Sequence, residues 1–436
     1  MTNTKMLFKP DMTVCQNDYP LDWYQNEFLP YAEAYQALPD RDISTILLWM
    51  EPYLEKAIKH FGDSLLLLAH YYMGGEIVKI IKYFGGTIGD SYQLALMAVN
   101  HPEKKIIVES AVHFMAESIT LLANPDQSVY ITNPKSGCTM EMLAKDFMVE
   151  PAFRQLNARY DNNIMPVCYM NTSGRVKAMT GAQNGAVCTS SNVKKIFEWA
   201  LKQNKKILFI PDRHMGENVA MWLNIPRDKI AYWPAGQAAV NFKLEEQNKE
   251  FIKQFDQAQL ILFASECGVH SYYQPEMVRY WQNEGYTVLV HPECRNEVVK
   301  IADGCGSTAY LWDMVTKDLA KTGKYAIGTE NHMVKNLKTH AEMNNITVVN
   351  LSDIPTNDFK KRGCGCATMS RNDPPHLVAL LDLLRLGKIP EFNLVKPGDV
   401  VNEFIGTRER LDEKGQQWIT MNARRALEKM ISITES

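Results

Sequence analysis

Three cysteines that stand far apart in the sequence, Cys138, Cys267 and Cys366, each close one of three similar stretches of chain. Equivalent residues of a repeat can meet at one point when the copies pack around an axis. Three thiolates at such a point can hold three irons of a [4Fe-4S] cluster and leave the fourth iron open as a Lewis acid. Simple packing is the competing interpretation, because free cysteine is also a common small core residue.

The remaining cysteines favour other roles. Cys364 and Cys366 could form half of a zinc site, but the chain has no second Cys or His pair at zinc-ribbon spacing. The chain has nine cysteines, and an odd number without an export signal argues against a disulfide framework. Apolar surroundings predict burial and packing for Cys168, Cys188, Cys294 and Cys305.

Histidines and potential proton carriers follow predicted strands. His70, His270 and His291 stand at strand exits, which form the edge where ligands bind in parallel sheets. Each would be an ordinary core histidine if taken alone, but their shared position favours a site. Tyr72 and Glu293 lie beside them and are the residues there that can exchange protons.

Hydroxyl residues at predicted helix starts offer a second kind of site. Free backbone amides and the positive end of the helix dipole hold phosphate or carboxylate groups there. The same residue types are favoured as N-caps, so both interpretations stand. Three such starts around one cavity would suit a substrate with several anionic groups. The residues are Ser91, Ser190, Ser307 and Thr308.

These side chains must be positioned by strands that alternate with helices. Such alternation predicts an α/β fold of parallel sheets whose strand exits share one edge. Three similar domains around an axis would point three edges at one central cavity. The predicted strands are 65–72, 106–108 and 129–132 in the first copy, 165–171, 207–210 and 260–263 in the second, and 287–290, 325–330 and 346–349 in the third.

The repeat also predicts the domain divisions. An N-terminal leader, with an amphipathic helix over 43–61, packs against the first copy. An insertion between about 220 and 257 lengthens the second copy. The predicted parts are a helical leader at 1–60, αβα domains at 61–150, 151–275 and 276–375, and a C-terminal helical segment at 376–436.

Composition narrows the class of protein. The chain has 436 residues, of which 46% are hydrophobic and 22% charged, with a formal net charge of −3. This balance is typical of a soluble globular protein and gives no electrostatic reason to expect nucleic acid. The N-terminus lacks a signal-like apolar run, and no stretch of about 18 apolar residues predicts a membrane span. We therefore expect a cytoplasmic protein without a membrane partner.

The motifs, taken in order, resemble the longer bacterial form of quinolinate synthase. The resemblance runs from about residue 60 to the C-terminus. Its motifs are His70-Tyr-Tyr72, Gly89-Asp-Ser91, Val112-His-Phe-Met-Ala-Glu117, Ser136-Gly-Cys138, Tyr169-Met-Asn171, Cys188-Thr-Ser-Ser-Asn192, Pro211-Asp-Arg-His-Met-Gly-Glu-Asn218, Cys267-Gly-Val-His270, His291-Pro-Glu-Cys294, Gly306-Ser-Thr308, Ile327-Gly-Thr-Glu330 and Cys366-Ala-Thr-Met369.

This resemblance implies three αβα domains around a pseudo-threefold axis, with an oxygen-sensitive [4Fe-4S] cluster held by Cys138, Cys267 and Cys366. The implied reaction condenses iminoaspartate with dihydroxyacetone phosphate to quinolinate, the pyridine precursor of NAD, with loss of phosphate and water. The sequence Trp233-Pro-Ala-Gly also looks like the lead-in to the second cysteine, but no thiol follows it.

The resemblance also implies residue roles. Tyr72 matches a tyrosine that transfers protons and guards the open iron, and Glu293 matches a carboxylate that acts as base. We expect a monomer or homodimer, and an oxidase or dehydrogenase partner that supplies iminoaspartate. The residues implied to hold the substrates' carboxylates and phosphate are His70, Ser91, Tyr169, Asn171, Ser190, His270, His291, Ser307 and Thr308.

The predicted architecture, taken alone, is also compatible with two other functions. A [4Fe-4S] reductase or radical enzyme that acts on a diphosphate could share the plan of one cysteine per domain, but it would need an electron donor. A non-enzymatic iron–sulfur sensor is the other rival. The absence of a recognisable DNA-binding motif or basic patch in the sequence disfavours the sensor.

Overall fold

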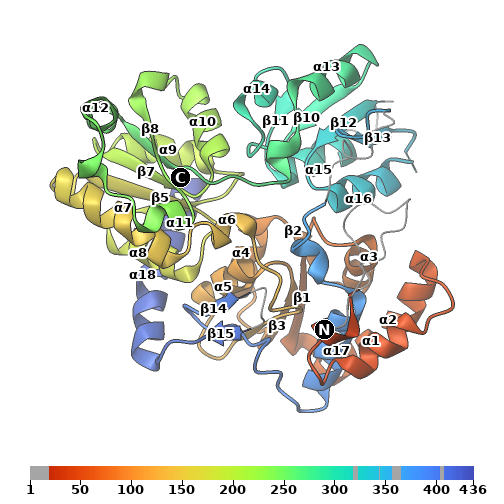
Figure 1. Ribbon diagram of the computed structural model, residues 1–436. Helices are drawn as coiled ribbons and strands as arrows, with labels where there is room; N and C mark the ends of the chain where they lie inside the picture. Colours follow the sequence, from red (N-terminus) through yellow and green to blue (C-terminus); the bar gives the residue numbers. More distant parts are fainter. Residues whose placement is uncertain (1–18, 318–322, 343, 356–364, 403–406) are drawn as a thin grey trace.

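The computed structural model describes residues 19–317, 323–342, 344–355, 365–402 and 407–436. This part of the chain contains three parallel sheets flanked by helices, and one antiparallel pair of strands, β14 (Val400–Asn402) and β15 (Thr407–Glu409). Figure 1 shows the three sheets as separate lobes, coloured orange, yellow-green and green to cyan along the sequence. The α/β fold with short parallel sheets, predicted from the alternation of elements, is confirmed.

The first sheet has the strand order β2-β1-β3-β4. All six residues of β1 are buried, as expected for a strand covered on both faces, and this explains its unbroken apolar run. Helices α3 (Gly75–Tyr83), α4 (Ser91–Asn100) and α5 (His113–Leu122) connect the strands. The strands are β1 (Leu65–His70), β2 (Thr87–Gly89), β3 (Ile106–Ser110) and β4 (Ser128–Ile131).

The second sheet has the order β6-β5-β7-β9-β8. The insertion contributes β8 (Ile230–Trp233), which pairs in parallel with β9 so that Trp233 lies opposite Phe263. The segment at Trp233, which resembles the lead-in to the second cysteine in sequence, is thus also the end of a strand at the same edge of the sheet. The other strands are β5 (Ile164–Tyr169), β6 (Ala186–Cys188), β7 (Lys206–Ile210) and β9 (Leu260–Phe263). Their main helices are α8 (Gly174–Ala182), α9 (Val193–Leu201) and α10 (Arg213–Trp222).

The third sheet, β11-β10-β12-β13, repeats the order of the first. In each sheet a short strand, β2, β6 or β11, pairs with the first strand of its unit. These strands were not predicted from the sequence, because runs of two or three residues show no periodicity. The elements are β10 (Thr287–Val290), β11 (Gly304–Cys305), β12 (Lys324–Gly328), β13 (Thr347–Asn350), α14 (Asn296–Val299), α15 (Thr308–Thr316) and α16 (Asn331–Glu342).

Helices from both ends of the chain cover the first two sheets. The predicted leader helix is α2 (Ile43–Phe61), which packs against the almost wholly buried α17 (Pro374–Arg385). The long α18 (Glu413–Glu435) packs along α8. Arg424 on α18 donates hydrogen bonds to the carbonyls of Leu121 and Ala123, at the end of α5. Thus α18 ties the first unit to the second.

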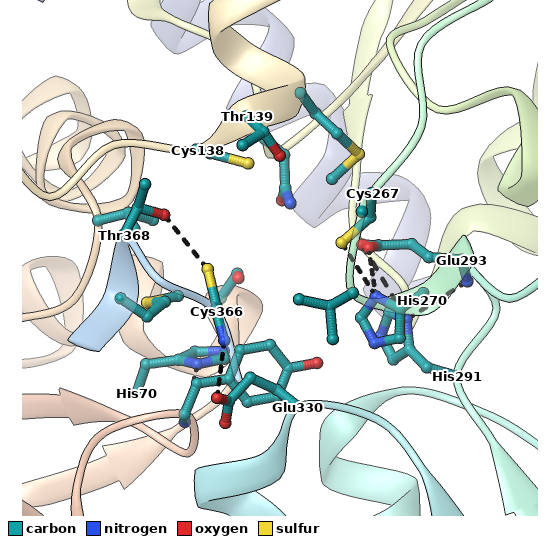
Figure 2. Close-up of a pocket in the computed structure, with 18 of the residues that line it drawn as sticks. His70, Cys138, Thr139, Cys267, His270, His291, Glu293, Glu330, Cys366 and Thr368 are labelled. Atoms are coloured by element: carbon teal, nitrogen blue, oxygen red, sulfur yellow. Dashed lines mark hydrogen bonds and ion pairs between the residues drawn. The ribbon is translucent and has the colours of Figure 1, made fainter. Parts of the chain in front are cut away.

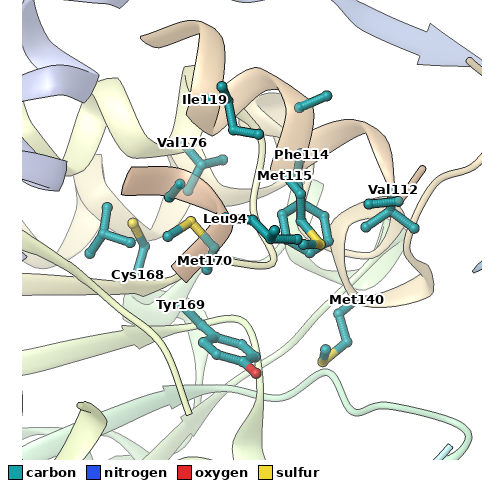
Figure 3. Packing of buried hydrophobic residues seen from close by; sticks show 14 of the residues in the cluster. Leu94, Val112, Phe114, Met115, Ile119, Met140, Cys168, Tyr169, Met170 and Val176 are labelled. Carbon is teal, nitrogen blue, oxygen red and sulfur yellow. The ribbon is translucent and has the colours of Figure 1, made fainter. Parts of the chain in front are cut away.

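The buried apolar side chains form one large core and two small ones. The large core joins the first and second sheets to α2, α17 and α18. Figure 3 shows part of it, where Phe114 and Ile119 from α5 lie near Met170 and Val176. The third sheet has a separate core on each face. In the described residues, no helix is both long and apolar enough to cross a membrane.

Candidate active site

One cavity of about 330 Å³ lies where residues from all three sheets meet. Every predicted site residue except Ser307 lines it. Figure 2 shows how side chains from the three units face one another there. The predicted residues in its wall are His70, Tyr72, Ser91, Cys138, Tyr169, Asn171, Ser190, Cys267, His270, His291, Glu293, Thr308 and Cys366.

The sulfur atoms of Cys138, Cys267 and Cys366 point into this common space (Figure 2). Burial raises the pKa of all three thiols, and the negative charges of neighbouring thiolates and carboxylates add to the effect. Three thiolates are therefore favoured here only beside a positive centre. Such a donor set fits an iron–sulfur cluster with one open iron. Cys364 of the zinc alternative lies outside the described residues.

Buried carboxylates hold the backbone of two of these cysteines. The Cys267 N–H donates to the Asp212 carboxylate at 3.3 Å, and the Cys366 N–H donates to Glu330 at 2.9 Å. The ligand atoms of Cys267, His270 and Glu293 also lie within 4.8 Å of one another, so these three residues could hold a metal ion as an alternative set.

A hydrogen-bond network forms the polar wall. Glu293 accepts the Tyr169 hydroxyl at 2.7 Å on one carboxylate oxygen, and its other oxygen lies 2.8 Å from His270 Nδ1. His270 Nε2 lies 3.0 Å from Thr329 Oγ1, which is 2.8 Å from the Tyr72 hydroxyl. A continuous chain therefore connects Tyr169 to Tyr72 through Glu293.

Burial and neighbouring charge set the protonation states of this wall. Burial opposes ionisation of Glu293, but His270, His291 and the Tyr169 hydroxyl lower its pKa to about 2. Burial lowers the pKa of His70 to about 4 and, with the adjacent His270, that of His291 to about 3. At neutral pH Glu293 is thus a carboxylate, and His70 and His291 are neutral imidazoles.

The amino-acid sequence of this chain is similar to those of known proteins. A family model described as "Quinolinate synthetase A protein" matches residues 55–391. Quinolinate synthase of Bacillus velezensis is 34% identical over 351 residues, which cover 78% of this chain and 89% of that protein. The Geobacillus kaustophilus quinolinate synthase is 34% identical over 360 residues, or 82% of this chain and 90% of its own length. The Bacillus thuringiensis quinolinate synthase is 32% identical over 370 residues, which cover 84% and 93%.

The chain belongs to the quinolinate synthase family. It is therefore an enzyme, as the resemblance predicted. The family match spans all three parallel sheets and every residue predicted for the site, but it ends at residue 391, earlier than the C-terminus we expected. The bridging helix α18 thus lies beyond the matched span.

The hydroxyl residues of this quinolinate synthase family member take two kinds of position. Ser91 and Thr308 are the first residues of α4 and α15, and Ser190 lies in the turn before α9. Ser307 is the N-cap of α15, where its Oγ accepts the Tyr310 N–H at 3.2 Å. Its structure therefore matches the capping interpretation, and anion binding by Ser307 stays a prediction.

The polar residues of the site that were not predicted include Glu330 and Thr329. Glu330 lines the cavity and Thr329 links Tyr72 to His270. Both directly follow β12. The rule that singled out His70 and His291, namely polar residues at strand exits, would have found them too.

The cavity also has an apolar wall. Its side chains come mainly from the start of α5 and from the segments around the first and third cysteines. The apolar wall consists of Val112, Phe114, Met115, Met140 and Met369.

Proposed function

We propose that the chain condenses iminoaspartate with dihydroxyacetone phosphate to quinolinate, releasing one phosphate and two waters, in the synthesis of NAD. The observation that carries this proposal is the presence of three thiols and the Tyr169–Glu293–His270–Thr329–Tyr72 chain in one cavity. The thiols suit a resident cofactor, and the chain of hydrogen bonds suits proton transfer between bound substrates.

The proposed cofactor is a [4Fe-4S] cluster held by Cys138, Cys267 and Cys366. When bound, it supplies a Lewis acid at its open iron. The convergence of the three buried sulfur atoms supports this assignment, as does the lack of a second Cys or His pair with zinc-ribbon spacing.

The reaction needs tautomerisation, Schiff-base formation and two dehydrations, so protons must be both accepted and donated. Glu293 is the proposed base, because its low pKa keeps it ionised at neutral pH. Tyr72 is the proposed acid. Burial raises the pKa of its phenol, so the hydroxyl is protonated at neutral pH, and its hydrogen bond with Thr329 places it at the end of the hydrogen-bond chain.

The substrates carry two carboxylates and a phosphate, and the cavity offers several places to hold them. Ser91, Ser190 and Thr308 lie at or before helix starts, where backbone amides attract anions. The neutral imidazoles of His70 and His291 can each donate one N–H.

We further propose that the enzyme works in the cytoplasm and receives iminoaspartate from a separate oxidase or dehydrogenase. Iminoaspartate is an imine that hydrolyses in water, so a cavity with one apolar wall protects it. Direct transfer of iminoaspartate from a partner enzyme would also limit its hydrolysis.

The test is anaerobic purification followed by assay without an added reductant. We expect the absorption and, after reduction, the electron paramagnetic resonance of a [4Fe-4S] cluster, together with quinolinate formed from the two substrates. Cluster-loaded protein that makes no quinolinate would refute the proposal. A requirement for an electron donor would favour the reductase alternative instead.

A further inference from the structure

A buried amine lies directly behind the cavity wall, at Lys177 on α8. Its side chain is fully buried, although lysine is among the residues least often buried. Nζ donates one hydrogen bond to the carbonyl oxygen of Met170, at 2.9 Å, and another to the carbonyl oxygen of Thr172. The proposed reaction assigns no role to this amine.

The two carbonyls flank Asn171, which lines the cavity. The Met170 carbonyl also accepts the Thr172 N–H at 2.8 Å, and Thr172 Oγ1 donates to the carbonyl of Tyr169 at 2.9 Å. One ammonium group therefore closes a turn that starts at Tyr169 and contains Asn171. The hydroxyl of that same tyrosine is the group that donates to Glu293.

Glu117 on α5 lies near the amine, where burial raises the pKa of its carboxyl to about 7 and its negative charge, when ionised, favours the ammonium form of Lys177. Its buried carboxylate accepts the Gly174 N–H at 2.6 Å and the Gly398 N–H at 2.7 Å. A Cβ atom at Gly174 would lie 2.3 Å from Glu117 Oε1, so only glycine permits this approach. Burial lowers the pKa of Lys177, and the nearby Glu117 charge opposes that shift.

The amine also contacts the opposite part of the wall. Lys177 Nζ lies 5.5 Å from the centroid of the Phe114 ring, and Phe114 lines the cavity together with Asn171. Burying an ammonium is costly unless it is hydrogen bonded and charge-compensated, whereas methionine would fill a similar volume without that cost. The placement therefore serves more than packing.

We infer that Lys177 is a positioning residue of the active site. Its ammonium fixes the turn at residues 169–172 and so holds the Tyr169 hydroxyl against Glu293 and the Asn171 side chain at the cavity wall. This inference rests on the proposed function, in which Asn171 contacts a substrate and Glu293 acts as base.

The test compares Lys177→Met with Lys194→Met in anaerobically prepared, cluster-loaded protein. Lys194 is exposed on α9 and serves as the matched control. We measure iron and sulfide per chain, kcat and KM for each substrate, and amide hydrogen exchange over residues 169–174. For Lys177→Met we expect full cluster content, faster exchange in this turn, and kcat/KM lower by on the order of 10²-fold, the usual cost of a small misplacement.

A conservative variant separates positioning from general damage. Lys177→Gln keeps N–H donors but loses the charge, so its turn should exchange more slowly than that of Lys177→Met and its kcat/KM should be higher. If Lys177→Met fails to fold, Lys177→Gln is compared directly with the wild type, and faster exchange with lower kcat/KM is again expected.

The outcomes distinguish this inference from the proposed function. Unchanged exchange of the turn, or unchanged kcat and KM despite faster exchange, would overturn the positioning role. A wild type that makes no quinolinate, combined with faster exchange in Lys177→Met, would overturn the proposed function and leave the assignment of the turn in place.

Discussion

The first two sheets and the third sheet are joined in different ways. The first two share a continuous apolar core with the terminal helices, whereas the third keeps its own cores. Hydrogen bonds to backbone carbonyls cross the joint between the second and third units. Asn218 Nδ2 donates to the carbonyls of Pro292 and Cys294, both at 2.8 Å, and Arg295 donates to that of Ser271 at 2.7 Å.

This difference separates the three cysteines from Glu293 and Thr308. All three cysteines pack against the shared core, so the thiols are held by the most continuous part of the molecule. Glu293 and Thr308 come instead from the third unit. Glu330 crosses the division, because its carboxylate accepts the Cys366 N–H. Cofactor binding and the proposed role of Glu293 as base should therefore respond separately to mutation.

The largest expected effect is loss of the cluster from the shared core. Cys267→Ser removes one of three thiolates, so we expect iron and sulfide content to collapse and quinolinate synthesis to disappear. Cys305→Ser is the control, because Cys305 lies in β11 of the third sheet and does not line the cavity. It should keep the cluster. Loss of the cluster from Cys305→Ser alone would reverse our choice of ligands.

The next effect should spare the cluster and remove catalysis. Glu293→Gln keeps the size of the side chain but removes the proposed base, which typically costs 10²-fold to about 10⁴-fold in kcat. Iron content and the visible spectrum should match those of the wild type. Glu297→Gln, which changes an exposed residue of α14, is the control and should retain activity. A variant at Glu293 that loses its cluster would break the division proposed above.

The sequence predicted which residues meet in the cavity better than it predicted the contacts between the units. His291 and Glu293 follow an apolar run, and parallel topology requires that such exits share an edge. By contrast, lysine is typical of a protein surface, so the sequence gave no sign that Lys177 is buried. Its partner group Glu117 is 60 positions away, and such contacts depend on how units pack rather than on local pattern.

An added methyl group should destabilise the protein more in the shared core than at a contact between the third unit and its neighbours. In Gly181→Ala, Cβ would lie 1.9 Å from the backbone oxygen of Asn422, where α18 crosses α8. We expect a loss of at least about 3 kcal/mol in the free energy of unfolding, since neither helix can yield locally. Gly75→Ala is the matched variant at the contact between α3 of the first unit and α16 of the third, because its Cβ would meet the Asn336 side chain at 3.0 Å. Urea unfolding should show a smaller loss there.

Two buried glutamates, at equivalent strands of the third sheet and the first sheet, also differ between the third unit and the shared core. Glu330, just after β12, accepts hydrogen bonds from the backbone of Cys366 and from the ring and backbone of His332, which help to lower its pKa. Glu109, in β3 of the shared core, has no hydrogen-bond partner for either carboxylate oxygen within the described residues. Burial raises the pKa of Glu109 well above its usual range, so the folded protein holds it protonated.

Glu109→Gln should therefore raise stability by an amount that grows with pH. Below about pH 4 the wild-type side chain is protonated in both the folded and the unfolded chain. As the pH rises, only the unfolded chain releases this proton, so wild-type stability falls by up to about 1.4 kcal/mol per pH unit until the pKa of the folded state is reached. Glutamine does not titrate. Urea unfolding at about pH 5 and about pH 8 should give a stability difference between Glu109→Gln and wild type that is larger at the higher pH, by up to about 4 kcal/mol if the side chain stays protonated over all three pH units. A constant difference would mean that Glu109 is ionised in the folded protein and has found a partner.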